Sequence, residues 1–342
     1  MKAWLLKEPV DLSSDNQPLI SGELPDPEAG PDEVVVKISV CGVCHTELDE
    51  IEGRIQCPSY PVVPGHQVVG RVVAAGQDVR ALRPDDRVGI GWFYSSCGIC
   101  HHCRSGFENL CPDFKATGMD VNGGYAAYIK VPATSAFTVP DVFTDSEAAP
   151  LLCAGAIGFR SLRLADIRNG DVLGLTGFGA SGHLVLKLVR HRFPDSPVFV
   201  FARSEKERSF ALSLGAKWAG DTDDQAPQLC RAIIDTTPVW KPVVKALKQL
   251  EPGGRLVINA IRKEAADQDI LLQLNYPEHL WMEKEIKSVA NVARDDIGGF
   301  LKVAAEIPIK PEIQEYPFKE ANRVLMELKK GLIKGAKVLM VR

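Results

Sequence analysis

The sequence lacks the charge patterns with which proteins bind nucleic acids or membrane surfaces. Its formal net charge is −4 over 342 residues, and no run of like charges or basic amphipathic segment stands out. We therefore expect no nucleic-acid partner and no membrane partner. Residues 1–6 carry one lysine and a short apolar run without the pattern of a signal peptide, and no apolar stretch has the length of a bilayer span. These absences predict a cytoplasmic protein.

Internal repeats and low-complexity tracts are also absent, and the length favours two domains. Cysteine is more informative, because the chain has nine of them. In a reducing compartment, clustered cysteines indicate metal binding or catalysis rather than disulfides. Four lie between Cys97 and Cys111, and Cys41 and Cys44 are also close together.

The two halves of the chain differ in texture. Residues 1–150 contain β-branched segments such as 34–40 and 68–73 between glycines and prolines, which predicts a barrel-like or partly open all-β lobe. From about residue 151, apolar runs alternate with helical patterns, which predicts a parallel sheet with helices on both faces. The expected strands are 171–176, 198–201, 232–235 and 254–258, and the expected helices are 181–191 and 205–214. The tail should add a helix (319–330) and a strand (337–341) to the first lobe.

The strongest local motif is a run of four cysteines at 97, 100, 103 and 111. Four thiolates at this spacing can surround one tetrahedral zinc ion without other ligands, as in closed structural sites. Free cysteines in a loop are the alternative explanation. The neighbouring His101 and His102 are not needed as ligands.

A second, dispersed set consists of Cys44, His66 and Cys153. Two thiolates and one imidazole form a zinc site with an open fourth position, which is typical of a catalytic zinc. Each residue alone has an ordinary explanation, since an isolated cysteine is often a small buried side chain and an isolated histidine often has a structural role.

The third motif is a glycine-rich turn, G-F-G-A-S-G, at residues 177–182. It follows a predicted strand and opens a predicted helix, which is the context that dinucleotide binding requires. Gly177 permits the tight turn, Gly179 lets the backbone approach a pyrophosphate, and Gly182 lets helix and strand pack closely. Ala180 and Ser181 lie at the helix N-terminus, which faces the phosphates. A merely glycine-rich connection is the alternative.

In this order, the motifs G-V-C44-H-T, G-H66-x3-G, the four-cysteine run, L-C153-A-G and G-F-G-A-S-G resemble the zinc-containing medium-chain dehydrogenase/reductase family, alcohol dehydrogenase type. The resemblance covers essentially the whole chain. It implies an α/β fold with a GroES-like, mostly-β catalytic domain and a Rossmann domain with a doubly wound parallel sheet. The expected boundaries are 1–154 for the catalytic domain with a structural zinc lobe at about 93–114, 155–289 for the Rossmann domain, and 290–342 for the return to the catalytic domain.

The resemblance also assigns roles. Cys44, rather than Cys41, would hold the catalytic zinc with His66 and Cys153, so two zinc ions are expected per chain, one catalytic and one structural. Thr46 would lie beside the zinc-bound oxygen and His45 near the cofactor pyrophosphate. The nicotinamide would be bordered by Ala260 and Ile261, and the substrate pocket by Trp92.

The implied function is reversible hydride transfer between a primary aliphatic or aromatic alcohol, or its aldehyde, and a nicotinamide dinucleotide. Zinc would stabilise the alcohol as an alkoxide, and Thr46 would pass the proton outward. Family members of this type suggest a homodimer or homotetramer.

Two residues depart from the family pattern. Gln67 stands where the family usually has glutamate after the zinc histidine. Because the amide carries no charge, we expect a more electropositive zinc site. Asp49 occupies the position at which many members end the proton relay with histidine. It either takes the proton or is an exposed loop carboxylate.

Cofactor choice is a third departure. An acidic residue at the end of the second Rossmann strand normally binds the ribose hydroxyls of NAD. Here Ala202 takes that place, and Arg203 and Ser204 follow, which can hold a 2′-phosphate. We therefore predict a preference for NADP(H) over NAD(H). The alternative is that Arg203 is a solvated surface residue.

Two other functions fit parts of the sequence. One is a zinc-free quinone or enoyl reductase of the same superfamily, which would need no metal ligands. The other is a non-catalytic, cofactor-binding member of the family, to which the changes at Gln67 and Asp49 would point.

Overall fold

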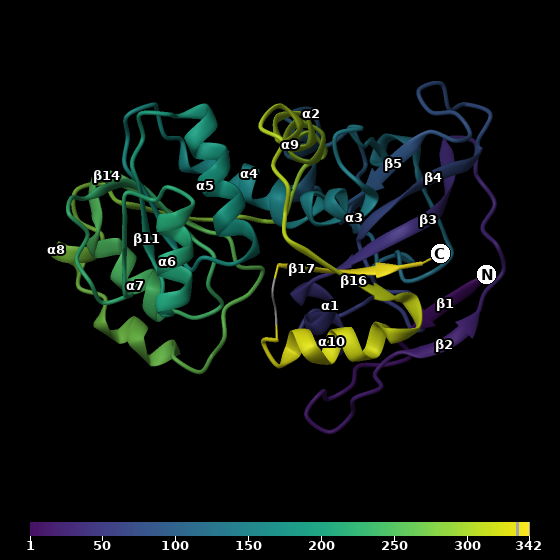
Figure 1. The fold of residues 1–342 in the computed structure, drawn as a ribbon, viewed down its shortest axis with the longest axis horizontal. Helices are drawn as coiled ribbons and strands as arrows, with labels where there is room; N and C mark the ends of the chain where they lie inside the picture. Colours follow the sequence, from purple (N-terminus) through teal and green to yellow (C-terminus); the bar gives the residue numbers. More distant parts are fainter. Residues whose placement is uncertain (333–334, 342) are drawn as a thin grey trace. The chain divides into compact units, whose positions relative to one another are not determined.

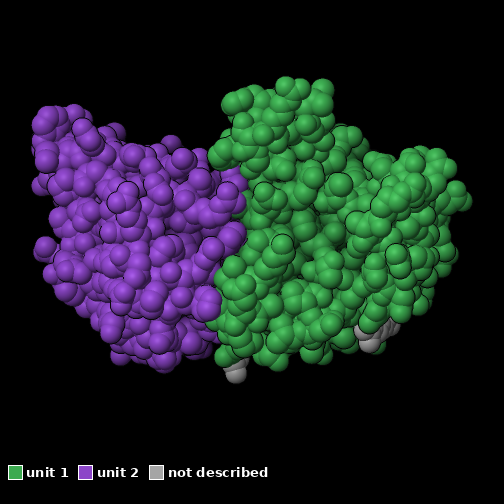
Figure 2. Space-filling model, turned by 90° about the horizontal axis from the view of Figure 1, so that it is seen from above, with its two compact units in different colours: residues 1–153, 292–342 green, residues 154–291 purple. Residues whose placement is uncertain are grey.

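The computed structural model describes residues 1–332 and 335–341. The chain folds into two compact units (Figure 2), the first formed by Met1–Cys153 and Val292–Arg342 and the second by Ala154–Asn291. The C-terminal segment thus packs with the N-terminal unit, and each unit has its own sheet.

The first unit is built on a seven-stranded sheet with the order β16-β17-β3-β4-β5-β9, in which β8 also pairs with β3 (Figure 1). All its pairings are antiparallel except that of β16 with β17. Two short ladders, β1 with β2 and β6 with β7, complete the strands. Their bounds are β1 (Lys2–Leu5), β2 (Ile20–Glu23), β3 (Glu33–Val43), β4 (Gln67–Ala75), β5 (Arg87–Ile90), β6 (Phe93–Ser95), β7 (Lys115–Ala116), β8 (Tyr128–Pro132), β9 (Phe137–Thr138), β16 (Ile313–Pro317) and β17 (Ala336–Met340).

The valines and isoleucines of β3 and β4 form much of the core of this unit, which explains why these segments are strands: β-branched residues fill a half-buried pleated surface. The helices that complete the unit are α1 (His45–Ile51), α2 (His101–Arg104), α3 (Asp145–Ala148), α9 (Arg294–Glu306) and α10 (Ala321–Lys329). Helix α1 follows β3 directly, with Cys44 as its N-cap residue.

The second unit is a six-stranded parallel sheet with the order β12-β11-β10-β13-β14-β15. Counted from its first strand, this is the order 3-2-1-4-5-6 of the Rossmann fold. It confirms the doubly wound sheet predicted from the sequence. The elements are α4 (Ala154–Ala165), β10 (Leu173–Thr176), α5 (Ala180–Arg192), β11 (Val198–Phe201), α6 (Glu205–Ser213), β12 (Trp218–Gly220), β13 (Cys230–Asp235), α7 (Lys241–Lys248), β14 (Leu250–Ile258), α8 (Tyr276–His279) and β15 (Glu285–Ser288).

Strands β10 and β11 are buried throughout, as expected for parallel strands covered on both faces. Several elements were not predicted from the sequence, among them β12, β15, α4, α7 and α9. The edge strand β15 is exposed at all four residues, so it carries no hydrophobic alternation to find.

Within the described residues, one helical run meets the length and composition of a membrane span. It covers Asp145–Ala165, and its most apolar window of 18 residues has a mean hydropathy of 1.2 and is 72% buried inside the protein. Core helices of water-soluble proteins pass the same test, so this run is weak evidence for a membrane segment.

Candidate functional site

Three side chains from distant parts of the first unit converge on one point. Cys44 caps α1, His66 immediately precedes β4, and Cys153 follows a short 3-10 turn at Ala149–Leu152. The Sγ atoms of Cys44 and Cys153 are 3.8 Å apart, and Nε2 of His66 lies 3.4 Å from Sγ of Cys153. A tetrahedral zinc with bonds of about 2.0–2.3 Å separates its ligand atoms by about 3.5–3.8 Å. The donor set therefore fits zinc.

The protonation of Cys44 also suits a metal, whereas the hydrogen bond with Cys44 raises the pKa of Cys153. Hydrogen bonding from Cys153, together with His66, holds the pKa of Cys44 well below its ordinary value, although burial opposes this shift. The thiolate is the form that binds metals. The site thus favours the ligand form of Cys44 before any ion arrives.

A buried glutamate that the sequence reading missed lies behind the histidine. Oε1 of Glu47 is 2.7 Å from Nδ1 of His66, and the two side chains are 0% and 1% exposed. Its other oxygen, Oε2, accepts a hydrogen bond from the backbone N–H of Cys44 at 2.6 Å. A carboxylate in this place fixes the ring so that Nε2 faces the metal and raises the basicity of the ligand.

The four-cysteine run also closes on itself. Cys100 caps α2, and the Sγ–Sγ distances are 3.9 Å for Cys97–Cys103, 3.6 Å for Cys100–Cys103 and 3.5 Å for Cys97–Cys111. Backbone N–H groups, first that of Ile99, lower the pKa of Cys97 to about 7. Four sulfurs at these distances suit one tetrahedral zinc with no open position.

The glycine turn in the second unit has the shape that a pyrophosphate needs. Gly177 has a φ of 76°, and Gly179 caps α5. A Cβ atom on Gly179 would meet nothing within 4 Å, whereas one on Gly182 would lie 3.0 Å from the carbonyl oxygen of Gly177. The turn is thus open at Gly179, where a ligand would approach, and closely packed at Gly182. Ala180 and Ser181 begin α5, with Ser181 Oγ bonded to the carbonyl of Ala154.

The end of β11 carries more positive charge than the sequence reading anticipated. Ala202 is buried, whereas Arg203 and Ser204 are exposed. Nη1 of Arg208 donates to the carbonyl oxygens of Ala202 and Arg203 at 2.8 and 2.9 Å and lies 3.3 Å from Oδ2 of Asp221. The i,i+5 spacing from Arg203 to Arg208 could have drawn attention to this second guanidinium.

Known proteins resemble this chain along its whole length. Residues 30–141 match the model of the alcohol dehydrogenase GroES-like domain. A protein of Mycobacterium tuberculosis described as "Probable alcohol dehydrogenase AdhA" is 39% identical over 100% of this chain and 97% of its own length. The chain belongs to the zinc-containing medium-chain dehydrogenase/reductase family, alcohol dehydrogenase type.

Further comparisons agree with this assignment. An alcohol dehydrogenase of Geobacillus stearothermophilus is 32% identical over 94% of this chain and 95% of its own length. The structure of a cinnamyl alcohol dehydrogenase from Sorghum bicolor superimposes with a TM-score of 0.82 at 27% identity, covering 99% of this chain and 97% of that one. The family predicted from the motifs is confirmed. This alcohol dehydrogenase is therefore an oxidoreductase of a family whose substrates are small-molecule alcohols.

Three further predicted residues, His45, Thr46 and Gln67, lie within two positions of a candidate ligand in the chain. Oγ1 of Thr46 lies 3.5 Å from Sγ of Cys44, which places the hydroxyl at the candidate zinc site, and His45 is exposed at the start of α1. Gln67 is buried in β4, and a Cβ on Gly42 would come within 2.5 Å of its Oε1. The amide therefore occupies the space that glycine leaves on the neighbouring strand.

Asp49 is not an exposed loop carboxylate. It lies in α1 with 5% exposure, and Nε of Arg54 is 2.6 Å from its Oδ1. One turn beyond Thr46 on the same helix, Glu50 is fully buried, and its pKa is raised well above the ordinary value by burial and by Glu47. Sequence reasoning passed over Glu50, although the i,i+4 spacing from Thr46 is a signal for a shared helix face.

Trp92 follows β5 and is partly exposed, with its ring 5.6 Å from that of Phe114. In the second unit, Ala260 and Ile261 follow β14, and Ile261 is 49% exposed. The roles predicted for these residues remain predictions.

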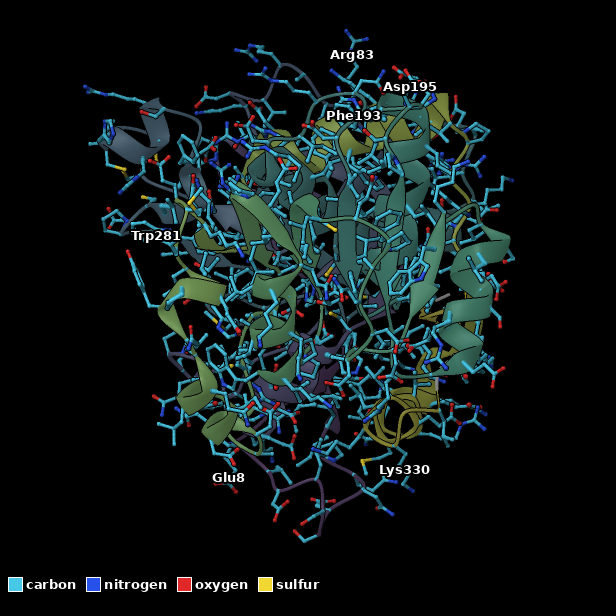
Figure 3. All side chains as sticks on the ribbon, turned by 90° about the vertical axis from the view of Figure 1, so that its left-hand side faces the viewer. Glu8, Arg83, Phe193, Asp195, Trp281 and Lys330 are labelled. Carbon is cyan, nitrogen blue, oxygen red and sulfur yellow. The ribbon has the colours of Figure 1, made fainter. Side chains whose placement is uncertain are left out.

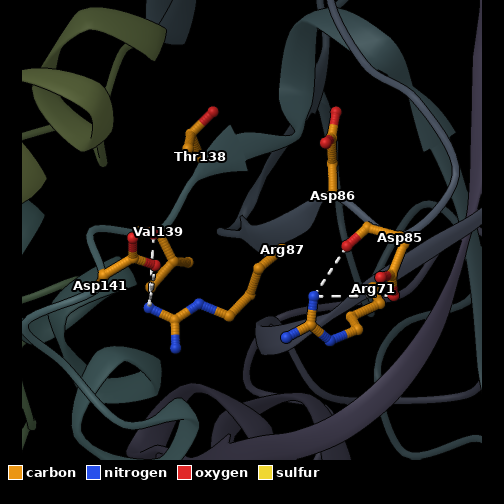
Figure 4. Close-up of a pocket in the computed structure, with 7 residues that line it drawn as sticks. All are labelled: Arg71, Asp85, Asp86, Arg87, Thr138, Val139 and Asp141. Carbon is orange, nitrogen blue, oxygen red and sulfur yellow. Dashed lines mark hydrogen bonds and ion pairs between the residues drawn. The ribbon is translucent and has the colours of Figure 1, made fainter.

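A separate surface hollow in the first unit contains none of the predicted residues (Figure 4). Both of its arginines are already occupied: Arg71 donates to the carbonyl of Asp85 at 2.8 Å, and Arg87 donates to that of Pro140 at 2.7 Å. Charges of both signs line it, so it favours neither anions nor cations. The lining residues are Arg71, Asp85, Asp86, Arg87, Thr138, Val139 and Asp141.

Proposed function

We propose that the protein is a zinc-dependent alcohol dehydrogenase or aldehyde reductase, which transfers hydride reversibly between a primary alcohol and NADP(H). The convergence of Cys44, His66 and Cys153 at ligand distances carries this proposal. Two thiolates and one imidazole leave one position of a tetrahedral zinc open for substrate. The four cysteines at residues 97–111 would hold a second, structural zinc.

The chain's own residues would orient the metal and move the proton. When bound, zinc supplies a Lewis acid that makes a substrate hydroxyl more acidic or polarises a carbonyl. Glu47 orients the ring of His66, and the position of Cys44 is fixed because it is the N-cap residue of α1. The hydroxyl of Thr46, next to Cys44 Sγ, would accept the substrate proton and pass it outward, with His45 at the exposed side.

Asp49 suits a structural role better than the role of final proton acceptor in this relay. Its carboxylate is already engaged by a cation, because Nε of Arg54 lies 2.6 Å from Oδ1 of Asp49. The pH profile of an Asp49→Asn variant tests whether this carboxylate accepts the proton.

The cofactor preference rests on charge at the end of β11. No carboxylate follows this strand directly, because Ala202 stands there, and the guanidinium groups of Arg203 and Arg208 lie on the same segment. The exposed Arg203 favours the 2′-phosphate of NADP(H) over the free hydroxyl of NAD(H), and Arg208 adds to this charge although Asp221 partly neutralises it. Arg203→Ala and Arg208→Ala should each lower the ratio of kcat/KM for NADPH over NADH. An unchanged ratio in both would refute the preference.

For the substrate, the aromatic ring of Trp92 beside Phe114 favours an apolar primary alcohol, aliphatic or aromatic. Trp92→Ala should raise KM for aromatic alcohols more than for short aliphatic ones.

A homodimer or homotetramer is supported by the edge of the Rossmann sheet. Every residue of β15 is exposed, including Ile286 at 46%, and an open edge strand is a template for pairing with a second copy. Tyr276 and Trp281, the latter labelled in Figure 3, are 60% and 54% exposed nearby in the chain. Light scattering should give the oligomeric state, and Ile286→Lys should shift it toward the monomer.

We further propose a cytoplasmic location, without nucleic-acid or membrane partners.

One experiment separates this function from its alternatives. Zinc content is measured together with the rates of alcohol oxidation with NAD⁺ or NADP⁺ and of aldehyde reduction with NADH or NADPH, before and after chelation. Two zinc ions per chain and activity lost on chelation support the proposal. One zinc without activity would instead indicate a non-catalytic member, and activity without zinc would indicate a quinone or enoyl reductase.

A further inference from the structure

A buried ion pair stands at the carboxyl end of β13 in the second unit. Asp235, the last residue of β13, is fully buried, and Nζ of Lys263 contacts its Oδ2. The ammonium also donates to the carbonyl oxygens of Thr237 at 2.7 Å and Val239 at 3.0 Å. Its three N–H donors thus have three acceptors inside the protein. Lys263 therefore has no donor left for a ligand, and any role in binding must be exerted through other residues.

The pair lies next to the glycine turn. Asp235 is the register partner of Thr176, the last residue of β10. Its Oδ1 accepts hydrogen bonds from the hydroxyl groups of Thr176 at 2.5 Å and Thr237 at 2.7 Å. Gly177 follows Thr176 directly, and a Cβ on Gly177 would lie 2.9 Å from Oγ1 of Thr236. The carboxylate is therefore anchored at the base of the turn that would receive the pyrophosphate.

Asp235 also holds both ends of the segment after β14. Its carbonyl oxygen accepts a hydrogen bond from the N–H of Asn259 at 2.8 Å, and its carboxylate binds Lys263, four residues further along the chain. The exposed Ile261 lies between these two attachment points. The ion pair therefore fixes a short loop at the carboxyl edge of β14.

The order of the sheet says which half of a dinucleotide this loop would meet. Ligands of such sheets lie across the carboxyl ends of the strands, with the adenosine ribose at the second strand and the pyrophosphate at the first. Those strands are β11 and β10, and β13 and β14 lie on the opposite side of β10 from β11. The nicotinamide half would therefore extend over the ends of β13 and β14.

We propose that Lys263 is a positioning residue for the nicotinamide half of the cofactor, acting through Asp235 and residues 259–263. The proposal rests on the proposed function, in that the glycine turn must bind a dinucleotide. Because Lys263 compensates the charge of Asp235, no unpaired negative charge stands at the base of the pyrophosphate site.

The test separates two effects of substitution: loss of the contact between Lys263 and Asp235, called the tether below, and exposure of an unpaired buried charge. Lys263→Met alone leaves a buried carboxylate without its cation, which strongly destabilises the unit. The double variant Lys263→Met with Asp235→Asn removes both charges and loses the tether. Lys263→Arg keeps the cation and is the conservative control.

The readout is the dissociation constant, from fluorescence or calorimetry, of the zinc-loaded full chain for NADPH, NADH and adenosine 2′,5′-bisphosphate. In the double variant, we expect the dinucleotides to bind about tenfold more weakly, the factor that corresponds to one charge-assisted hydrogen bond. The bisphosphate, which lacks the nicotinamide half, should bind within about twofold of the wild type. Lys263→Arg should retain most of the dinucleotide affinity.

Two results would overturn the inference: dinucleotide affinity unchanged in the double variant, or an equal loss for the bisphosphate, which would indicate a general structural effect. If wild-type protein bound none of the three ligands, the proposed function itself would fail. The wild type provides a test that needs no variant. Amide exchange in residues 259–263 should slow with NADPH but not with the bisphosphate, and equal exchange under both conditions would contradict the role of this loop.

Discussion

The contact between Glu47 and His66 allows a direct test of how the candidate zinc site is assembled. The carboxylate lies 2.7 Å from Nδ1 of His66 and accepts the N–H of Cys44 at 2.6 Å, so it touches two of the three proposed ligands. Glu47→Gln keeps the size of the side chain but removes its charge and one of its two acceptor oxygens. It should therefore weaken zinc binding without emptying the space behind the ring.

The size of the effect follows from the burial of this contact. Loss of the residue that orients a metal-ligating histidine typically lowers metal affinity about 10- to 100-fold, or about 1.4–2.7 kcal/mol. Because Glu47 is 0% exposed, water cannot replace its carboxylate. We therefore expect a loss near the upper end, about 100-fold, at the site of Cys44, His66 and Cys153.

Zinc release to a colorimetric chelator measures this affinity, and the chain contains its own reference. The four-cysteine site takes its ligands from residues 97–111 alone, so its zinc should be released as in the wild type. A matched control is Glu147→Gln, because Glu147 makes the same capping-box contact, with the N–H of Thr144 at 2.8 Å, at the start of α3.

Glu147→Gln should leave both zinc affinities within about twofold of the wild type. A loss below about threefold at the three-ligand site of Glu47→Gln would refute the reasoning. An equal loss at both sites would also refute it, since it would point to general destabilisation.

Three further predictions concern titrating groups. Gln67→Glu adds a negative charge beside the site while Glu47 remains, so the pH–rate profile should move to higher pH; a shift to lower pH, or none, would contradict the electropositive site. In zinc-free protein, alkylation followed by mass spectrometry should find Cys97 (pKa about 7) modified at pH 8 well before Cys57, whose pKa burial raises to about 11, because the thiolate is the reactive form. Asp49→Asn should lower the melting temperature through loss of the Arg54 salt bridge and leave the pH profile of kcat unchanged; a shifted profile would restore Asp49 to the proton relay.

The metal and glycine motifs could be predicted because their chemistry depends on residue type and spacing. Glu47 could not be singled out as easily. In the run E-L-D-E, three carboxylates look alike, and only the phase of α1 turns Glu47 toward His66 and Asp49 toward Arg54. The position three residues after the N-cap Cys44 was the available signal, since a capping box places glutamate there.

The missed elements have different causes. Each residue of the strand β15 (Glu285–Ser288) is exposed, and the strand owes its conformation to pairing with β14, which local sequence does not reveal. Helix α9 contains Gly298 beside a second glycine, and glycine lowers helix propensity, so packing of Phe300 and Leu301 into the core must offset that preference.

The two ion pairs proposed to support binding should act independently, because each belongs to a different unit and a different ligand. Glu47 contacts His66 and Cys44, whereas Asp235 contacts Lys263 and the threonines around it, so the two clusters have no residue in common. Effects of substitutions without shared partners usually add to within about 0.5 kcal/mol. Glu47→Gln should therefore lower zinc affinity while leaving the dissociation constant for adenosine 2′,5′-bisphosphate within about twofold, and the Asp235 and Lys263 double variant should lower dinucleotide affinity while leaving zinc release unchanged. Parallel titrations on both variants measure this, and a loss of zinc affinity in the Asp235 and Lys263 variant would show that the clusters are coupled.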